Sequence, residues 1–312
     1  MSTVGTFLQS MRRECGASQS DPILAMDWLN GRYAEVLERA PFQFLAKEGT
    51  ITTVAAISAG TVTLTNGSTT VTETTSNANG WSSSVEGRFF RRRGDSEYYS
   101  ISTFTDANPD TLTLARGYEG STSTLETYDL WARYYSLASD VRHVVSVFTA
   151  SGPVAQLTEV SQSDMDAGFP SRPSLGEPHY WSMAGRDSSN LLRVEFYPAP
   201  DTAEGVYYRY IQSTPSLADA STTILPQIPV SLLRAGWLSD YWSWRGASGD
   251  DSGVTLKLAQ AQRFENEFQK RVSELIAREC LALSPKRIRL QSRFTRHRFH
   301  TKFGREIGIT LP

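Results

Sequence analysis

The sequence contains few of the residues on which metal binding and redox chemistry depend. Only two of its 312 residues are cysteine, Cys15 and Cys280, and neither belongs to a C-x-x-C pair, so no zinc or thiol–disulfide motif is present. Four histidines supply little material for acid–base catalysis or for a metal site, which needs three or four ligands. We therefore expect no bound metal and no cofactor.

Membrane and enzyme motifs are also missing. No apolar run is long enough to cross a bilayer, and the first residues lack the basic and apolar segments of a signal peptide. The motifs G-x-x-x-x-G-K-[ST], G-x-G-x-x-G, G-x-S-x-G and H-E-x-x-H do not occur. Asp140 with His143 marks no activated nucleophile, and Asp240 with Asp250 and Asp251 matches no calcium loop. We expect a non-enzymatic protein that is made in the cytoplasm and does not enter a membrane.

The positive charge is concentrated near the C-terminus. Residues 286–305 contain eight lysine or arginine residues and no acidic residue, and because the whole chain carries −2, the rest carries −10. Phe294, Phe299 and Phe303 are interspersed among these cations, whereas disordered tails usually lack aromatic residues. We predict an extended basic arm that becomes ordered on a partner; a disordered tail and an arm that binds nucleic acid directly are the alternatives.

The remainder of the chain contains helical and β-rich segments. Residues 50–124 are rich in Thr, Ser, Gly and Val, and Asn66-Gly67 within them is typical of a tight β-hairpin. Residues 191–197 and 206–212 alternate in polarity and predict a second β-hairpin. Apolar residues at helical spacing predict helices over 3–15, 22–39, 229–245 and 254–280.

We therefore predict an α+β fold: a helical-bundle body with a central β-hairpin, an inserted small β-domain and an extended C-terminal arm. The predicted divisions are a discontinuous body at 1–49 and 125–285, an inserted β-domain at 50–124, and the arm at 286–312.

Two further groups of residues are candidates for contact with other molecules. Trp242 and Trp244 cannot face the same side of one helix, so one of them is a candidate for a subunit interface. Arg91-Arg92-Arg93, flanked by Phe89 and Phe90, is either a solvated strand end or a contact with a partner or nucleic acid.

Several segments, taken in order, resemble the head-to-tail adaptor proteins of tailed bacteriophages. They are Asp27-Trp28-Leu29-Asn30 leading to Ala40-Pro41-Phe42, then Tyr135-Ser-Leu-Ala-Ser-Asp140, then Val194-Glu-Phe-Tyr197-Pro-Ala-Pro-Asp201 running into Val206-Tyr-Tyr-Arg-Tyr210, and the helices after Ile228-Pro229. The resemblance covers most of the chain outside residues 50–124, whose Leu112-Thr-Leu114 and Gly117-Tyr118-Glu-Gly120 look like small β-modules of phage tail proteins.

The resemblance implies a virion structural protein at the head–tail junction. Such adaptors form a ring of about twelve subunits between the portal protein and the tail or nozzle proteins, around the channel through which phage DNA passes without sequence recognition. The arm would then dock on the portal. The implied portal-docking residues are Lys286, Arg287, Arg289, Arg293, Phe294, Arg296, Arg298, Phe299, Lys302, Phe303 and Arg305.

Two other functions are consistent with parts of the sequence. A DNA-binding or packaging accessory protein would use the basic arm directly and would bind DNA in a strongly salt-dependent way. An enzymatic or carbohydrate-binding tail component would rely on the β-rich segment and its aromatic residues.

Overall fold

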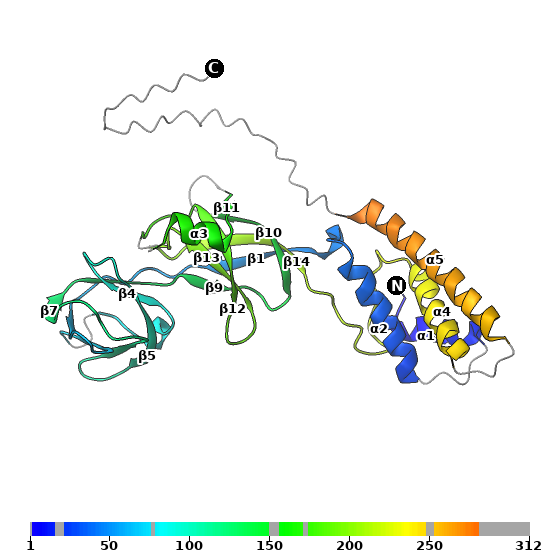
Figure 1. The fold of residues 1–312 in the computed structure, drawn as a ribbon, viewed down its shortest axis with the longest axis horizontal. Coiled ribbons are helices and arrows are strands. Elements are labelled where there is room, and N and C mark those ends of the chain that lie inside the picture. Colours follow the sequence, from blue (N-terminus) through cyan, green and yellow to red (C-terminus); the bar gives the residue numbers. More distant parts are fainter. Residues whose placement is uncertain are drawn as a thin grey trace, which may run out of the picture. The chain divides into compact units, whose positions relative to one another are not determined.

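The computed structural model describes residues 2–15, 22–75, 79–149, 156–170, 174–247 and 253–280. These residues form five α-helices and fourteen β-strands arranged in three sheets (Figure 1). The predicted arm at 286–312, with all the residues assigned to portal docking, lies outside the described residues.

The prediction of a helical-bundle body is wrong, because fourteen strands in three sheets occupy the chain between α2 and α4. Strand β14 (Gly205–Gln212) shows the physical reason: Val206, Tyr208 and Tyr210 are buried, while Tyr207 and Arg209 between them are exposed. A period of two turns one face of a strand toward a core. The residues between the N-terminal and C-terminal helices therefore build sheets with a core of their own.

Four helices nevertheless pack together, and they confirm the four predicted helical segments. They are α1 (Val4–Glu14), α2 (Pro22–Glu38), α4 (Val230–Ala247) and α5 (Val254–Glu279). Leu29, Leu233, Trp237 and Phe268 are completely buried between them. The indole N–H of Trp237 donates to the carbonyl of Ala25 at 3.0 Å, which satisfies its one polar group inside an apolar contact.

Two sheets share one core between the helices and the β-rich segment. Trp181, Val194, Phe196, Val147 and Tyr208 are all buried in this core. The first sheet has the order β1-β14-β10, with β1 (Ala46–Thr52) and β10 (Val141–Thr149); the second has the order β11-β12-β13-β9, with β11 (Thr158–Glu159), β12 (Tyr180–Arg186), β13 (Leu192–Tyr197) and β9 (Tyr134–Ser136). Helix α3 (Gln162–Gly168) lies between β11 and β12 in the sequence.

The predicted central β-hairpin is also wrong. Strands β13 and β14 do not pair with each other: β13 pairs with β12 and β9, and β14 pairs with β1 and β10. The connection between them bonds to other segments, since Ala199 pairs with Leu175, and Thr53 donates its N–H to the carbonyl of Glu204 at 2.8 Å. Pro198 and Pro200 have no N–H to offer a hairpin ladder. Alternation identified both strands but not their partners.

The third sheet has seven strands and forms a nearly closed barrel. Its order is β7-β2-β3-β6-β5-β4-β8, with β2 (Val62–Leu64), β3 (Thr70–Glu73), β4 (Phe89–Arg92), β5 (Tyr99–Thr105), β6 (Thr111–Leu114), β7 (Ser123–Glu126) and β8 (Tyr128–Trp131). The hairpin predicted at Asn66-Gly67 is confirmed: β2 and β3 are antiparallel, and Gly67 has a positive φ of 75°, which favours glycine. The division of the chain at residues 50 and 124 stays a prediction.

One segment closes the barrel. Strand β7 pairs with β2 at one edge, and β8 pairs with β4 at the other. Only Thr127 separates β7 from β8, and its carbonyl accepts a hydrogen bond from the N–H of Arg93 at 2.9 Å. The interior is filled by buried residues that include Trp81, Phe90 and Tyr128. Phe90 points into this core, so its neighbour Phe89 faces outward, as the pleat requires.

Candidate interaction surfaces

The two tryptophans predicted for a subunit interface lie near the end of α4. The ring of Trp242 is partly buried and contacts Tyr241 edge to face, with 5.3 Å between ring centroids. The ring of Trp244 lies 5.9 Å from that of Trp28 in α2 and remains 37% exposed. Both rings are therefore supported by the bundle on one side, and Trp244 leaves a large apolar surface open. Their role in an interface stays a prediction.

Other exposed apolar side chains lie at the same end of the bundle. Ile23 lies in the first turn of α2, and Leu256 and Leu258 lie in the first turns of α5; they are 70%, 67% and 48% exposed. Figure 1 shows the starts of α2 and α5 beside the end of α4. Exposed apolar side chains on neighbouring elements are candidates for contact with another molecule.

The arginine triplet Arg91-Arg92-Arg93 holds the seam of the barrel. Arg91 and Arg93 donate to the two oxygens of Asp129 at 2.8 and 2.9 Å. Arg92 donates to both oxygens of Glu126 at 2.8 and 2.9 Å. This bidentate hydrogen bonding lowers the pKa of Glu126. The triplet thus joins β4 to the closing segment, and its charges are already paired with acids.

A second arginine links the barrel to the four-stranded sheet. Arg133 lies in the two-residue connection between β8 and β9, and its side chain is only 10% exposed. Its Nε donates to the completely buried carboxylate of Glu195 at 2.5 Å, and one terminal nitrogen donates to the hydroxyl of Tyr98 at 3.2 Å. The guanidinium also faces the rings of Phe89, Tyr98 and Tyr134, at 5.6, 5.9 and 5.3 Å from the ring centroids.

The charge of Arg133 is stabilised although it is buried. Burial alone would disfavour the charged form, but the hydrogen bond to Glu195 and its negative charge outweigh that effect and raise the pKa of Arg133. The second carboxylate oxygen of Glu195 accepts from Gln162 of α3 at 2.9 Å, and Gln162 accepts from Ser182 of β12 at 3.1 Å. The network thus fixes the barrel's aromatic outer face against the neighbouring sheet.

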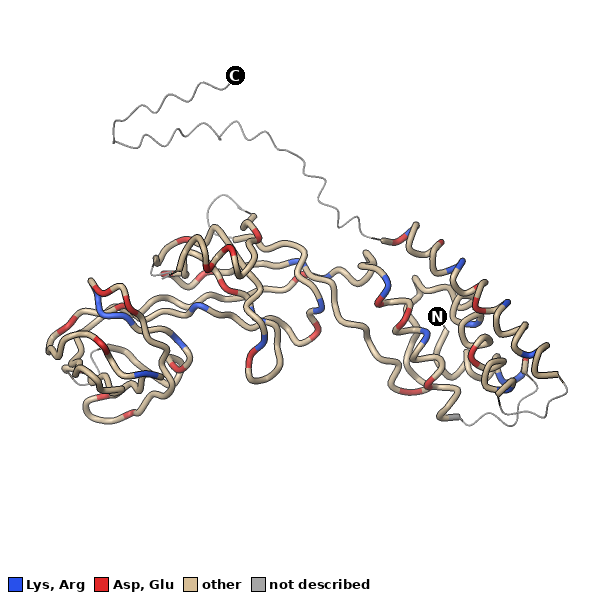
Figure 2. Tube along the Cα trace, in the orientation of Figure 1, with Lys and Arg blue, Asp and Glu red and all other residues tan. Residues whose placement is uncertain are grey.

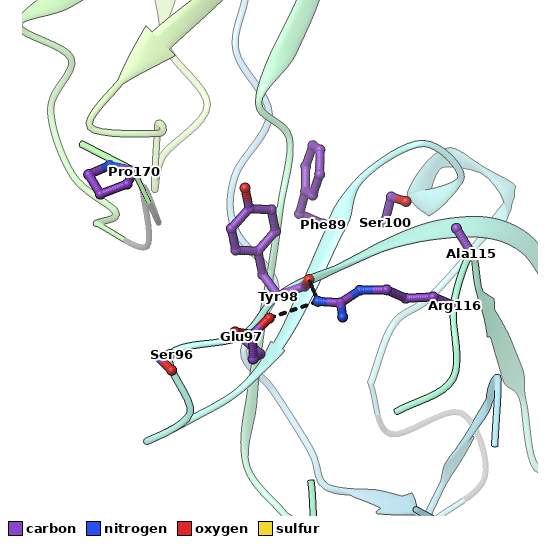
Figure 3. A pocket seen from close by; sticks show the side chains of 8 residues that line it. All are labelled: Phe89, Ser96, Glu97, Tyr98, Ser100, Ala115, Arg116 and Pro170. Carbon is purple, nitrogen blue, oxygen red and sulfur yellow. Dashed lines mark hydrogen bonds and ion pairs between the residues drawn. The ribbon is translucent and has the colours of Figure 1, made fainter. Parts of the chain in front are cut away.

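An open pocket of about 680 Å³ lies beside this network (Figure 3). Its lining consists of Phe89, Ser96, Glu97, Tyr98, Ser100, Ala115, Arg116 and Pro170. We call it the Tyr98 pocket. Seven of the eight residues belong to the barrel and its loops, while Pro170 follows α3. In Figure 3, Arg116 and Glu97 lie at one wall with their charges paired, and the rings of Tyr98 and Phe89 lie next to each other. The sequence prediction did not single out Tyr98 or Arg116.

Two of the carboxylates considered as catalytic or cation-binding groups already have partners, and Asp250 and Asp251 lie outside the described residues. The carboxylate of Asp140 bonds to the Lys47 amine and the Tyr210 hydroxyl, both at 2.9 Å, and Asp240 bonds to Arg32. Across the part of the chain that the structure describes, no three His, Cys, Asp or Glu side chains form a group able to hold a metal ion. No helix among these residues is long and apolar enough to cross a membrane.

Acidic and basic residues are interspersed along the described chain. Figure 2 shows Lys and Arg positions next to Asp and Glu positions in the helices and in the barrel. Many of these neighbours are ion pairs, such as Arg32 with Glu35, Asp240 and Glu265 inside the bundle. The described surface therefore lacks the long run of unopposed cations found at 286–305 in the sequence.

Comparison with known proteins identifies a family. The model of the SU10 adaptor protein family matches residues 75–289, more than half of the chain. The match includes the barrel from β4 onward, both other sheets except β1, and helices α4 and α5. It therefore covers most of residues 50–124, which the sequence resemblance had set apart, and it ends before Arg293. No curated protein matches the chain. The chain belongs to the SU10 adaptor protein family, a family of bacteriophage structural adaptors.

Proposed function

We propose that this protein forms a ring-shaped head-to-tail adaptor between the portal and the tail or nozzle proteins of a phage. The observation that supports this proposal is the family match, which extends over residues 75–289. Twelve subunits, the number that the resemblance implies, would surround the channel through which DNA leaves the head.

A closed ring needs two different faces on each subunit, since each subunit contacts its neighbours head to tail. The exposed ring of Trp244 and the partly buried ring of Trp242 supply one such face at the end of α4. Aromatic side chains that are already supported on one side lose little conformational entropy when a partner covers the other. We assign the ring contact to these two tryptophans.

The basic arm is assigned to the portal. In the described chain, Arg92, Arg116 and Arg133 each bond to a carboxylate of the same chain. The segment 286–305 has eight cations and no acidic residue of its own, a composition suited to an acidic surface on a partner. Phe294, Phe299 and Phe303 would anchor the arm in pockets of the portal, and the arginines would set its register and orientation.

The acidic remainder of the chain is suited to a channel. Residues outside 286–305 carry a formal net charge of −10. A phosphate backbone binds proteins mainly through cations, so a surface with few unpaired cations does not retard passing DNA. DNA would then move past the ring without being bound or read.

Truncation after Pro285 tests the docking role. Phage that carry the truncated protein should package DNA but lose it, and should lack tails, because the ring no longer attaches to the portal. A matched variant, Phe294→Ser with Phe299→Ser and Phe303→Ser, keeps all eight cations and should show the same defect. Virions that retain DNA and tails without the arm would refute the proposed docking role.

The second candidate function is direct DNA binding by the arm, which the eight unopposed cations of 286–305 favour. It predicts that the purified protein shifts a DNA fragment at low salt and that binding weakens steeply as salt rises. The triple phenylalanine variant separates the two functions, since it keeps the charge that DNA binding needs and lacks the anchors that docking needs.

A further inference from the structure

The Tyr98 pocket has a lining that combines an apolar wall with convergent polar groups. Phe89, Tyr98, Ala115 and Pro170 provide the apolar surface, and the polar side chains are those of Ser96, Glu97, Ser100 and Arg116. Pockets that bind small molecules share this composition, in which a few polar groups fix the orientation of a ligand on an apolar wall. The pocket is thus suited to a ligand that is apolar on its faces and polar around its edges.

We infer that the Tyr98 pocket binds a neutral carbohydrate. A pyranose ring presents C–H groups on its faces and hydroxyls around its rim. Its face matches the ring of Tyr98, and its hydroxyls match the serine hydroxyls and the paired carboxylate and guanidinium of Glu97 and Arg116, which accept and donate hydrogen bonds respectively. This binding is a further property of the protein and does not depend on the ring or on portal docking.

The charges of the pocket argue against an anionic ligand. Arg116 donates from one terminal nitrogen to Glu119 at 2.6 Å and from the other to Glu97 at 2.8 Å. Its guanidinium also lies over the ring of Tyr99, 4.6 Å from the centroid. A phosphate or a nucleic acid would meet two carboxylates around one cation that is already paired. A neutral hydroxyl-rich ligand meets no such repulsion and can use the remaining donor and acceptor positions.

The walls of the pocket are held in place before any ligand arrives. The Tyr98 hydroxyl accepts from Arg133, and the Tyr98 ring packs edge to face on Phe89, with 5.6 Å between centroids. Phe89 in turn stacks on the buried Trp131 at 6.1 Å. A preformed wall lowers the entropy that binding would otherwise cost. The buried Arg133–Glu195 network therefore acts as the support of this pocket.

A proline-rich peptide is the competing ligand, because such peptides bind to grooves lined by aromatic residues. The pocket favours a carbohydrate instead. Only two aromatic rings, those of Phe89 and Tyr98, are part of the lining, and five of the eight lining residues carry hydroxyl or charged groups. A polyproline helix has few donors to satisfy them, whereas each sugar ring has several.

Binding is tested on the full-length protein with maltohexaose, cellohexaose and chitohexaose by isothermal titration calorimetry and saturation-transfer NMR. We expect one of the three to bind with a Kd of about 0.1 to 1 mM, which corresponds to a small open site. Ala115→Phe fills the pocket from an exposed position and should abolish binding. Glu97→Gln should weaken it at least tenfold.

Glu48→Gln is the matched control. Glu48 pairs with Arg209 at 2.9 Å and is 59% exposed, as Glu97 pairs with Arg116 at 2.8 Å and is 58% exposed, but Glu48 lies on β1 and does not line the pocket. This variant should bind like the wild type. Failure of all three oligosaccharides to bind at about 10 mM overturns the inference. So does binding that survives in Ala115→Phe, or binding of decaproline that Ala115→Phe removes.

Discussion

Replacement of Glu195 by glutamine should destabilise the protein far more than removal of an exposed ion pair. The Glu195 side chain is completely buried, and its two oxygens accept from Arg133 at 2.5 Å and from Gln162 at 2.9 Å. Glutamine has nearly the same shape but no charge, and its amide nitrogen would face one of these two donors. The variant therefore leaves the guanidinium of Arg133 buried with no counter-charge from Glu195.

The expected magnitude follows from the burial of both partners. Breaking a buried pair by removing one charge costs roughly 3–5 kcal/mol, because the remaining charge is neither solvated nor paired. Glu48→Gln removes a pair of similar length between Glu48 and Arg209, which are 59% and 62% exposed. Exposed pairs contribute roughly 0–1 kcal/mol, since water solvates both charges after the change. Glu195→Gln should therefore lower the free energy of unfolding several times more than Glu48→Gln.

Urea unfolding at constant pH, monitored by tryptophan fluorescence, measures the free energy of unfolding of both variants. Trp131 and Trp181 are buried near the network and report its loss. The double variant Arg133→Met with Glu195→Met should recover much of the lost stability, because apolar side chains of similar volume avoid the burial of charge. If Glu195→Gln costs no more than Glu48→Gln, the network is not the support we infer from its geometry.

Three further predictions concern other parts of the molecule. Gly236→Ala places a methyl group within 3.0 Å of the facing phenylalanine ring of α5 and should lower the free energy of unfolding by about 1–3 kcal/mol. Gly31→Ala meets no atom within 4 Å and should raise it by about 0.5–1 kcal/mol, and thermal unfolding measures both variants. Lys47, and to a smaller degree a tyrosine hydroxyl, lower the pKa of Asp140. The stability that Asp140 contributes is therefore present above its unfolded pKa and is lost as pH falls through its folded pKa. Asp140→Asn should lower the melting temperature at pH 6, and this effect should shrink as pH falls below about 4. Burial raises the pKa of Cys15 to about 11, so at pH 8 the Cys15 thiol is ionised in only about one molecule in a thousand. Mass spectrometry should therefore find Cys15 alkylated more slowly than the exposed cysteine at the end of α5.

The individual elements were largely predictable from the sequence, because they depend on local periodicity. The helices over 22–39 and 254–280 and the turn at Asn66-Gly67 follow from side chains a few residues apart. Strand pairing depends on residues far apart in the chain, and no local pattern in the sequence identifies which strands pair. For example, Ile211 pairs with Ala46 across the whole barrel segment rather than with the adjacent β13. The prediction of a hairpin between β13 and β14 was wrong for this reason.

Ion-pair partners in the candidate sites were equally hard to predict from the sequence. Arg91-Arg92-Arg93 had two interpretations, solvation or contact with a partner, and the structure places all three guanidinium groups on Asp129 and Glu126. Those acids lie more than thirty residues away in the chain, so no local pattern connects them to the arginines. Arg133 and Tyr98 were missed for the same reason, since their importance arises only where three separate elements meet.

The presence or absence of acidic partners within the same fold helps to distinguish structural cations from cations that bind another molecule. The cluster of arginines at the barrel seam finds its acids within the fold, where a buried or half-buried cation without a partner would be costly. The segment 286–305 differs in composition: it has eight cations, no acid, and three phenylalanines between them. The acids of the described chain are in part already paired, as with Glu126 and Asp129. Charge alone would suit DNA equally well. The three phenylalanines add apolar anchors that pockets on a protein surface can bury, and for this reason we favour a protein partner for the arm.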